Sequence, residues 1–334
     1  MDIDDLLVAH ASQAMQGMPA IVNGADLLDR EFPEPEWLVE GLIPSIGLGI
    51  LAGRPKVGKS WLGLELSLAV CSGGYFLSRK VKAGKVLYIA IEDNPRRLKD
   101  RMIKQGWTRD AAANLQIVFA DAFRERYGGK DGQNRLADEI AGGYYALTII
   151  DTVARAFSIR DWNDLSLVTG TLAPIQEAAL AAEVCVIGCD HHNKLGSMDP
   201  ILAVVGSVGK VGVADVIMGI FREQGRPGVQ LAITGRDVVE QELTLFFDGT
   251  TGCYQVSNPQ DEITTLQRET IAAIESLEGG ATLAEIVEIT GRNKGTIDRE
   301  LKLLRERGFV RKEGTRWVAQ EVMQPTQPMQ PTQP

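Results

Sequence analysis

The chain has 334 residues, of which 44% are hydrophobic and 24% are charged, and its formal net charge at pH 7 is −9. That composition is typical of globular proteins and allows one large and one smaller domain, while the acidic balance argues against wholesale nonspecific binding to polyanions. We expect a reduced, cytoplasmic protein for three reasons. The four cysteines are scattered, the sequence shows no secretory signal, and no apolar run approaches the roughly 20 residues that a membrane span needs.

The chain opens with an acidic leader, residues 1–36, which contains one amphipathic stretch that could form a docking helix. From residue 37 to residue 257, short apolar runs alternate with helical patterns. The runs are 47–52, 86–91, 116–120, 146–150 and 184–189. This alternation predicts an α/β domain with a mainly parallel sheet, and three later runs (215–221, 229–234 and 242–247) lie too close together for helices and predict antiparallel hairpins.

The stretch Gly53-Arg54-Pro55-Lys56-Val57-Gly58-Lys59-Ser60 fits the phosphate-binding pattern G-x-x-x-x-G-K-S/T, between an apolar run and a helical pattern. In such a loop, backbone N–H groups and a helix N-terminus surround the phosphates, the lysine reaches the β- and γ-oxygens, and the serine hydroxyl binds Mg²⁺. The sequence therefore predicts binding of ATP with Mg²⁺. The candidate nucleotide-binding residues are Gly53, Pro55, Lys56, Val57, Gly58, Lys59, Ser60 and Trp61.

Two further strands end in carboxylates. Asp151 follows the apolar run 146–150 and is the candidate second Mg²⁺ residue, although an aspartate there could instead cap a turn. Glu92 follows the run 86–91 and is the candidate general base for water, whereas Asp93 or Asn94 would cap the next helix.

Four motifs in this order resemble the RecA-type ATPase core of hexameric replicative helicases, and most closely the RepA helicase group within the DnaB-like superfamily. They are the phosphate loop, the strand before Glu92, the strand ending at Asp151 and the strand that runs into Asp190-His191-His192-Asn193-Lys194. The resemblance spans residues 37 to 256. It implies that Glu92 is the catalytic base, that Asp151 holds Mg²⁺, and that His192, or else His191, senses the γ-phosphate.

Other interpretations of the histidines remain open. With Cys185 and Cys189 they could bind a metal, but this spacing is not that of a zinc site, and a hydrogen-bonded structural histidine pair is a further alternative. The resemblance also implies a homo-hexamer or other ring in which a basic residue of one protomer reaches the neighbour's ATP. Arg236 is the candidate, Lys210 is the second choice, and an ion pair with Asp237 is the structural alternative for Arg236.

The resemblance places single-stranded DNA in the channel of the ring, against the loops at 155–163 and 194–210. The basic residues available there for phosphate contacts are Arg155, Arg160, Lys194 and Lys210. Ordinary surface loops would carry similar residues.

Residues 262–319 predict three helices and a hairpin, which is the pattern of a winged helix-turn-helix. Residues 261–290 carry a net charge of −6 and residues 291–317 one of +5, so basic charge gathers on the third helix and the hairpin. The candidate DNA contacts are Asn293, Lys294, Arg299, Arg311 and Lys312, although such domains also dock proteins and Asp298 and Glu300 weaken the case for DNA. The tail 320–334 repeats Met-Gln-Pro-Thr-Gln-Pro and is expected to be disordered.

Together these features predict an ATP-hydrolysing DNA motor of the RepA-like helicase type. The alternative is a regulatory or loader ATPase whose winged helix binds duplex DNA or a protein partner without unwinding.

Overall fold

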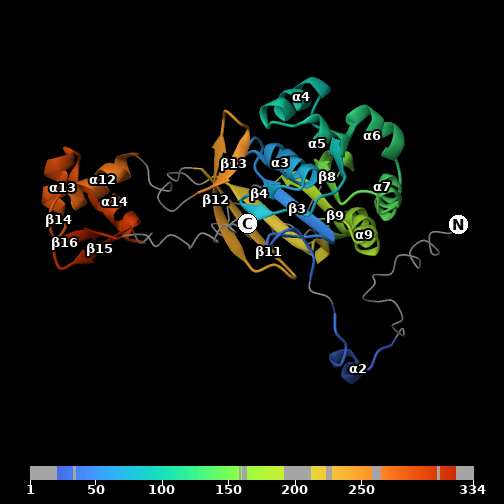
Figure 1. Ribbon diagram of the computed structural model, residues 1–334, viewed down its shortest axis with the longest axis horizontal. Coiled ribbons are helices and arrows are strands. Elements are labelled where there is room, and N and C mark those ends of the chain that lie inside the picture. The colour runs from blue at the N-terminus through green and yellow to red at the C-terminus, as the bar shows by residue number, and fades with distance from the viewer. Residues whose placement is uncertain are drawn as a thin grey trace, which may run out of the picture. The chain divides into compact units, whose positions relative to one another are not determined.

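The computed structural model describes residues 21–32, 35–157, 159, 164–191, 212–222, 228–257, 265–306 and 309–320. The described residues up to 222 and from 228 to 256 form one compact unit, and those from 257 onward form a second (Figure 1). Within the described part of the chain, no helix combines the length and apolar character needed to cross a membrane.

A nine-stranded sheet organises the first unit. Its strand order is β13-β12-β11-β10-β3-β9-β8-β6-β7. The six strands from β10 to β7 run parallel, and β11, β12 and β13 continue the sheet in antiparallel pairs. The strands are β3 (Gly47–Gly53), β6 (Val86–Ala90), β7 (Leu115–Phe119), β8 (Leu147–Asp151), β9 (Cys185–His191), β10 (Val216–Phe221), β11 (Val229–Gly235), β12 (Gln241–Asp248) and β13 (Cys253–Val256).

Helices cover both faces of this sheet, which is why every residue of the central strand β3 is buried (Figure 1). On one face, α3 (Lys59–Ser72), α4 (Pro95–Lys104) and α5 (Arg109–Ala113) enclose a core that includes Leu64, Tyr88 and Leu98. The other face packs against α6 (Ala120–Tyr127), α7 (Gly132–Ala141), α8 (Val153–Ala156) and α9 (Leu165–Ala181). The predicted α/β fold with a mostly parallel sheet is confirmed.

Short elements precede the sheet or lie at its margin. They are α2 (Gly24–Leu28), the β1–β2 pair (Trp37–Val39 and Ile43–Pro44) and the β4–β5 pair (Tyr75–Phe76 and Arg79–Lys80). The three runs expected to form antiparallel hairpins correspond to β10, β11 and β12, which pair antiparallel in that order. The first of them, β10, also pairs parallel with β3, which the sequence did not predict. The last strand, β13, has no counterpart in the sequence prediction.

The described residues of the second unit form three helices and a small sheet in the order β14-β16-β15. Thr282 caps α13 in a reciprocal arrangement, because its hydroxyl accepts from the Glu285 N–H while the Glu285 carboxylate accepts from the Thr282 N–H. Ile286, Leu301 and Trp317 are among the buried side chains of its core. The elements are α12 (Thr265–Glu275), β14 (Ala281–Thr282), α13 (Leu283–Thr290), α14 (Lys294–Glu306), β15 (Val310–Glu313) and β16 (Arg316–Ala319).

Candidate nucleotide-binding site

The loop between β3 and α3 has the backbone geometry of an anion-binding turn. Lys56 and Gly58 adopt left-handed conformations, with φ of 65° and 117°. Gly58 precedes the first residue of α3 and has no side chain to cap it, so backbone N–H groups at this helix N-terminus are available to an anion. A Cβ atom at Gly58 would lie 1.7 Å from the Tyr254 hydroxyl, so this position accepts only glycine.

Lys59 is held in place by the loop itself. Its ammonium group donates to the carbonyl oxygens of Gly53, at 2.8 Å, and Arg54, at 3.2 Å, and the residue is only 5% exposed. Burial lowers the pKa of Lys59, while nearby groups, among them the carboxylates of Asp151, Asp190 and Glu92, act in the opposite direction. The lysine is thus positioned before any phosphate arrives.

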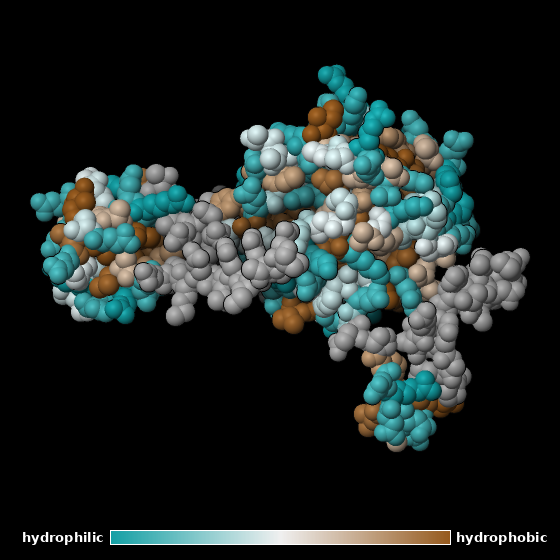
Figure 2. Space-filling model, in the orientation of Figure 1, coloured by the Kyte–Doolittle hydropathy of each residue, from teal (hydrophilic) through white to brown (hydrophobic). Residues whose placement is uncertain are grey.

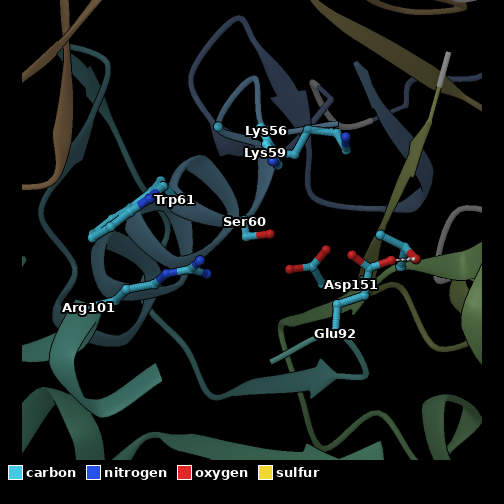
Figure 3. Close-up of a pocket in the computed structure, with 9 residues that line it drawn as sticks. Lys56, Lys59, Ser60, Trp61, Glu92, Arg101 and Asp151 are labelled. Carbon is cyan, nitrogen blue, oxygen red and sulfur yellow. Dashed lines mark hydrogen bonds between the residues drawn. The ribbon is translucent and has the colours of Figure 1, made fainter. Parts of the chain in front are cut away.

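A pocket of about 270 Å³ lies in front of this loop (Figure 3). The phosphate loop, the ends of β6 and β8, and helix α4 all contribute to its wall. The lining residues are Lys56, Gly58, Lys59, Ser60, Trp61, Glu92, Arg101, Asp151 and Thr152. The structure therefore brings five of the eight predicted nucleotide-binding residues, the predicted base and the predicted metal residue into one cavity. The other three, Gly53, Pro55 and Val57, belong to the loop but do not line the pocket.

Asp151 ends β8 and is 3% exposed. Its Oδ2 accepts from the Tyr88 hydroxyl at 3.2 Å, whereas Oδ1 has no hydrogen-bond partner among the described residues. Burial raises the pKa of Asp151, and the nearby hydroxyls of Ser60 and Tyr88 oppose that rise. A buried carboxylate oxygen that lacks a partner and faces a serine hydroxyl fits Mg²⁺, which prefers oxygen ligands (Figure 3).

Glu92 reaches the pocket from the end of β6. Its Oε1 accepts from the Thr152 hydroxyl at 2.9 Å and forms an ion pair with the Arg155 Nε at 3.1 Å. The adjacent Asp93 turns away and binds Arg101 at 2.7 Å, and Asn94 caps α4 by accepting from a backbone N–H at 2.9 Å. Of the two carboxylates that follow this strand, Glu92 is the one that lines the pocket.

Trp61 and Arg101 form a flat wall of the pocket. The Arg101 guanidinium lies over the Trp61 ring, 5.1 Å from its centroid, and the ring makes an edge contact with Phe247 at 5.4 Å. Sequence reasoning missed Arg101 and Thr152, because neither belongs to a short motif. It quoted Asp190 only as part of the fourth motif and gave it no role, although Asp190 is fully buried on β9 and its charge acts on Lys59.

Arg236 does not approach the pocket of its own chain. The register pairs Val216 with both Gly49 and Gly235, so Arg236 lies near the start of β3, whereas the phosphate loop follows the end of that strand. Arg236 forms an ion pair with Asp215 at 3.1 Å rather than with Asp237, and it donates to the Gly212 carbonyl at 3.1 Å.

Several predicted site residues lie outside the described part of the chain. These are Arg160, His192, Lys194 and Lys210, and the side chain of His191 belongs with them. Cys185 and Cys189 are buried in β9, and burial is the main reason why the pKa of each thiol is raised. Among the described residues no group of three or more His, Cys, Asp or Glu side chains is arranged to hold a metal ion, so nothing there supports the metal interpretation of these cysteines.

Glu65, in the first half of α3, is a partly buried carboxylate whose ionised form lowers the stability of the folded protein. It accepts from the Tyr254 N–H at 2.8 Å, and burial raises its pKa from 4.5 to about 7. The titratable groups that face it are the Cys253 thiol and the Tyr254 phenol, whose pKa values are raised to about 11 and about 12 and which stay neutral at pH 8. Ionisation of Glu65 itself therefore governs the local pH dependence.

We expect Glu65→Gln to stabilise the protein at pH 8. Because the folded pKa lies above the unfolded one, the folded state binds the extra proton, and the stability that this proton contributes is lost as pH rises from 4.5 to 7. Glutamine keeps the acceptor without the charge, so the free energy of unfolding should rise by about 1–3 kcal/mol at pH 8 and by less at pH 5. Urea unfolding at both pH values measures this, with the exposed Glu177→Gln as control. An equal gain at the two pH values would contradict the assignment.

Comparison with known proteins places this site in a family. Residues 17–197 match the family model AAA_25, described as an AAA domain, and no curated protein matches the chain. Among solved structures, the RadB recombinase is 16% identical, with a TM-score of 0.46, over 65% of this chain and 93% of its own length. A KaiC-like protein, PH0186 from Pyrococcus horikoshii, is 13% identical, with a TM-score of 0.45, over 66% and 94%.

A DnaB-like replicative helicase is 14% identical, with a TM-score of 0.48, over 63% of this chain and 57% of that chain, so the present chain spans little more than half of that helicase's length. The family match, by contrast, covers more than half of the present chain and includes the phosphate loop, Glu92 and Asp151. Because this family model matches more than half of the chain and the match includes the phosphate loop, the chain belongs to the AAA_25 family of AAA domains and is a P-loop ATPase.

Proposed function

We propose that the protein is a ring-forming motor that hydrolyses ATP to move along single-stranded DNA, as its resemblance to RepA-like helicases implies. The observation that carries the proposal is the ion pair between Glu92, the proposed base, and Arg155, the proposed DNA contact, at 3.1 Å. One side chain thereby connects the hydrolytic site with the loop expected to face DNA.

The proposed chemistry assigns a task to each pocket residue. Lys59 neutralises charge on the β- and γ-phosphates, and Ser60 with Asp151 would hold Mg²⁺, which supplies further positive charge to the phosphates. Glu92 orients the attacking water and accepts its proton. Tyr88 and Thr152 fix the two carboxylates through the hydrogen bonds already described.

Arg155 would make hydrolysis depend on DNA. In the structure it occupies Glu92 Oε1, an atom that the attacking water also needs. The Arg155 side chain is 66% exposed and can therefore be captured by a phosphate of the DNA backbone. Once captured, the guanidinium would no longer compete with the attacking water for Oε1, while the hydrogen bond from Thr152 would still orient the carboxylate.

Steady-state ATPase activity without DNA, with a single-stranded oligonucleotide and with duplex tests this proposal. We expect strong stimulation of the wild type by single strands. Arg155→Ala should raise the DNA-free rate up to about fivefold, the equivalent of an exposed ion pair, and remove the stimulation. The matched control is Arg124→Ala, because Arg124 is also exposed and ion-paired, with Asp121 on α6, and should behave as wild type.

The two parts of the proposal fail separately. A wild type that is indifferent to single strands would refute the motor. A variant at Arg155 that keeps its stimulation would refute only the link through Glu92.

Further residues enter the proposal through the resemblance alone. His192 would sense the γ-phosphate, and Arg160, Lys194 and Lys210 would join Arg155 as DNA contacts in a homo-hexamer or other ring. Arg236 would act on the neighbouring protomer's ATP, which requires it to leave Asp215.

A regulatory ATPase that binds duplex DNA is the second candidate, and the surface of α14 favours it. Glu300 faces inward, where it binds Arg292 at 2.8 Å and accepts from the Thr270 hydroxyl at 2.9 Å, so it does not oppose DNA as the sequence suggested. Asp298 is paired with Lys302 at 2.8 Å. The predicted duplex contacts on this proposed winged helix-turn-helix, Asn293, Lys294, Arg299, Arg311 and Lys312, are all exposed, and Arg311 is paired with Glu313 at 2.8 Å. ATPase activity that responds to duplex alone would favour this candidate.

A further inference from the structure

Tyr254 connects the β12–β13 hairpin to the phosphate loop. The hydroxyl of Tyr254, on β13, donates to the backbone carbonyl of Val57 at 3.2 Å, and Tyr254 is 5% exposed. Burial raises the pKa of Tyr254 to about 12, so its hydroxyl keeps its proton and remains a donor at neutral pH. Val57 lies in the middle of the loop, immediately before Gly58.

Other contacts hold this tyrosine in place. Its backbone N–H donates to Glu65 at 2.8 Å, and its ring packs against Phe247 of β12, with centroids 5.2 Å apart. Gln105 joins the same hairpin to the start of α3, because its amide donates to the carbonyls of Gly252, at 3.0 Å, and Trp61, at 3.1 Å. The hairpin is thus connected both to the loop and to the helix that follows it.

The Val57–Gly58 peptide gives this contact its significance for phosphate binding. In a planar trans peptide the C=O and the next N–H point in opposite directions. A Val57 carbonyl fixed on Tyr254 therefore turns the Gly58 N–H away from Tyr254, and Gly58 is one of the residues that line the nucleotide pocket. Without the hydroxyl this peptide unit is free to rotate, and ordering it again would cost part of the binding energy.

We propose that Tyr254 is a positioning residue for the nucleotide site, which holds the Val57–Gly58 peptide in the orientation that binds phosphate. This inference rests on the proposed ATPase function but assigns a role outside the recognised motifs. Tyr254 lies three residues before Ser257, where the second unit begins. The strand that leads to the second unit is therefore the strand that holds the loop.

Replacement of the hydroxyl alone tests the proposal in the full-length chain. Tyr254→Phe keeps the ring and its contact with Phe247 but removes the hydrogen bond to Val57. We expect the KM for ATP and the Kd for ADP to rise by about two- to tenfold, with kcat changed less than about twofold. A purely structural role would lower the melting temperature without this separation of KM from kcat.

The control is Tyr144→Phe, which also removes a hydrogen-bonded hydroxyl. The Tyr144 hydroxyl accepts from Lys85 at 2.6 Å, and Tyr144 is exposed and does not line the pocket. It should leave both constants unchanged. Tyr254→Leu, which also removes the ring, should weaken ADP binding further, and if it does not fold the Phe variant decides alone. Unchanged KM and Kd in Tyr254→Phe would overturn the inference, whereas a wild type that neither binds nor hydrolyses ATP would overturn the proposed function.

Discussion

Glu92→Gln is expected to lower kcat for ATP hydrolysis by about 10²–10⁴-fold while ATP still binds. Glutamine has nearly the same shape and can accept from the Thr152 hydroxyl as Glu92 does, at 2.9 Å, but it cannot take a proton from water. Single-turnover hydrolysis measures the loss, and equilibrium binding of a fluorescent ATP analogue measures the retained affinity. The combination identifies the proton acceptor, because a residue that only shapes the pocket would change affinity as well.

Asp93→Asn is the matched control for this experiment. Asp93 is the neighbouring carboxylate, but it binds Arg101 outside the hydrolytic position, so hydrolysis should fall far less than in Glu92→Gln. Hydrolysis at the wild-type rate in Glu92→Gln would rule out this glutamate as the base.

Lys59→Ala is expected to weaken ATP binding and to lower kcat/KM by about 10²–10³-fold or more, which is the effect of removing one donor that stabilises charge in a closed site. The ammonium group is already positioned by the Gly53 and Arg54 carbonyls, so its interaction with phosphate needs little reorganisation. Kinetics and calorimetric ATP binding would measure the two losses.

Lys82→Ala provides the comparison, since Lys82 is an exposed lysine in an ion pair with Glu36 at 2.5 Å and does not line the nucleotide pocket. A Lys59→Ala protein with wild-type affinity and rate would mean that the loop does not bind the phosphates of ATP.

Motifs with a local cause were predictable from the sequence. The loop 53–60 has glycine at position 58, where φ is 117°, and the apolar runs before Glu92 and Asp151 are long enough to form buried parallel strands, as β6 and β8 are. Parallel strands bring their carboxyl ends to one edge of the sheet, so the pocket that contains Glu92 and Asp151 follows from topology.

Contacts between distant parts of the chain were not predictable in this way. Tyr254 is 197 residues from Val57 in sequence, and its strand β13 has only four residues, too few for a clear alternating pattern. Arg155 was assigned to DNA from its charge and from the loop that the resemblance places in the channel, whereas its pair with Glu92 depends on the turn after β8. Glu300 likewise has the sequence context of a surface residue on a charged helix, and only the structure shows that it binds Arg292, eight positions away.

The environment of Asp215 has a consequence for how readily Arg236 can be released. Besides Arg236, this carboxylate accepts from the Leu48 N–H at 2.9 Å and from the Gln176 amide at 3.0 Å. Because these donors remain, departure of the arginine leaves Asp215 with its hydrogen bonds largely satisfied. The Arg236 side chain is 57% exposed, and such a pair contributes only about 0–1 kcal/mol. In the ring that we propose, exchange of Asp215 for a phosphate on an adjoining subunit would therefore cost little beyond the hydrogen bond from Arg236 to the Gly212 carbonyl.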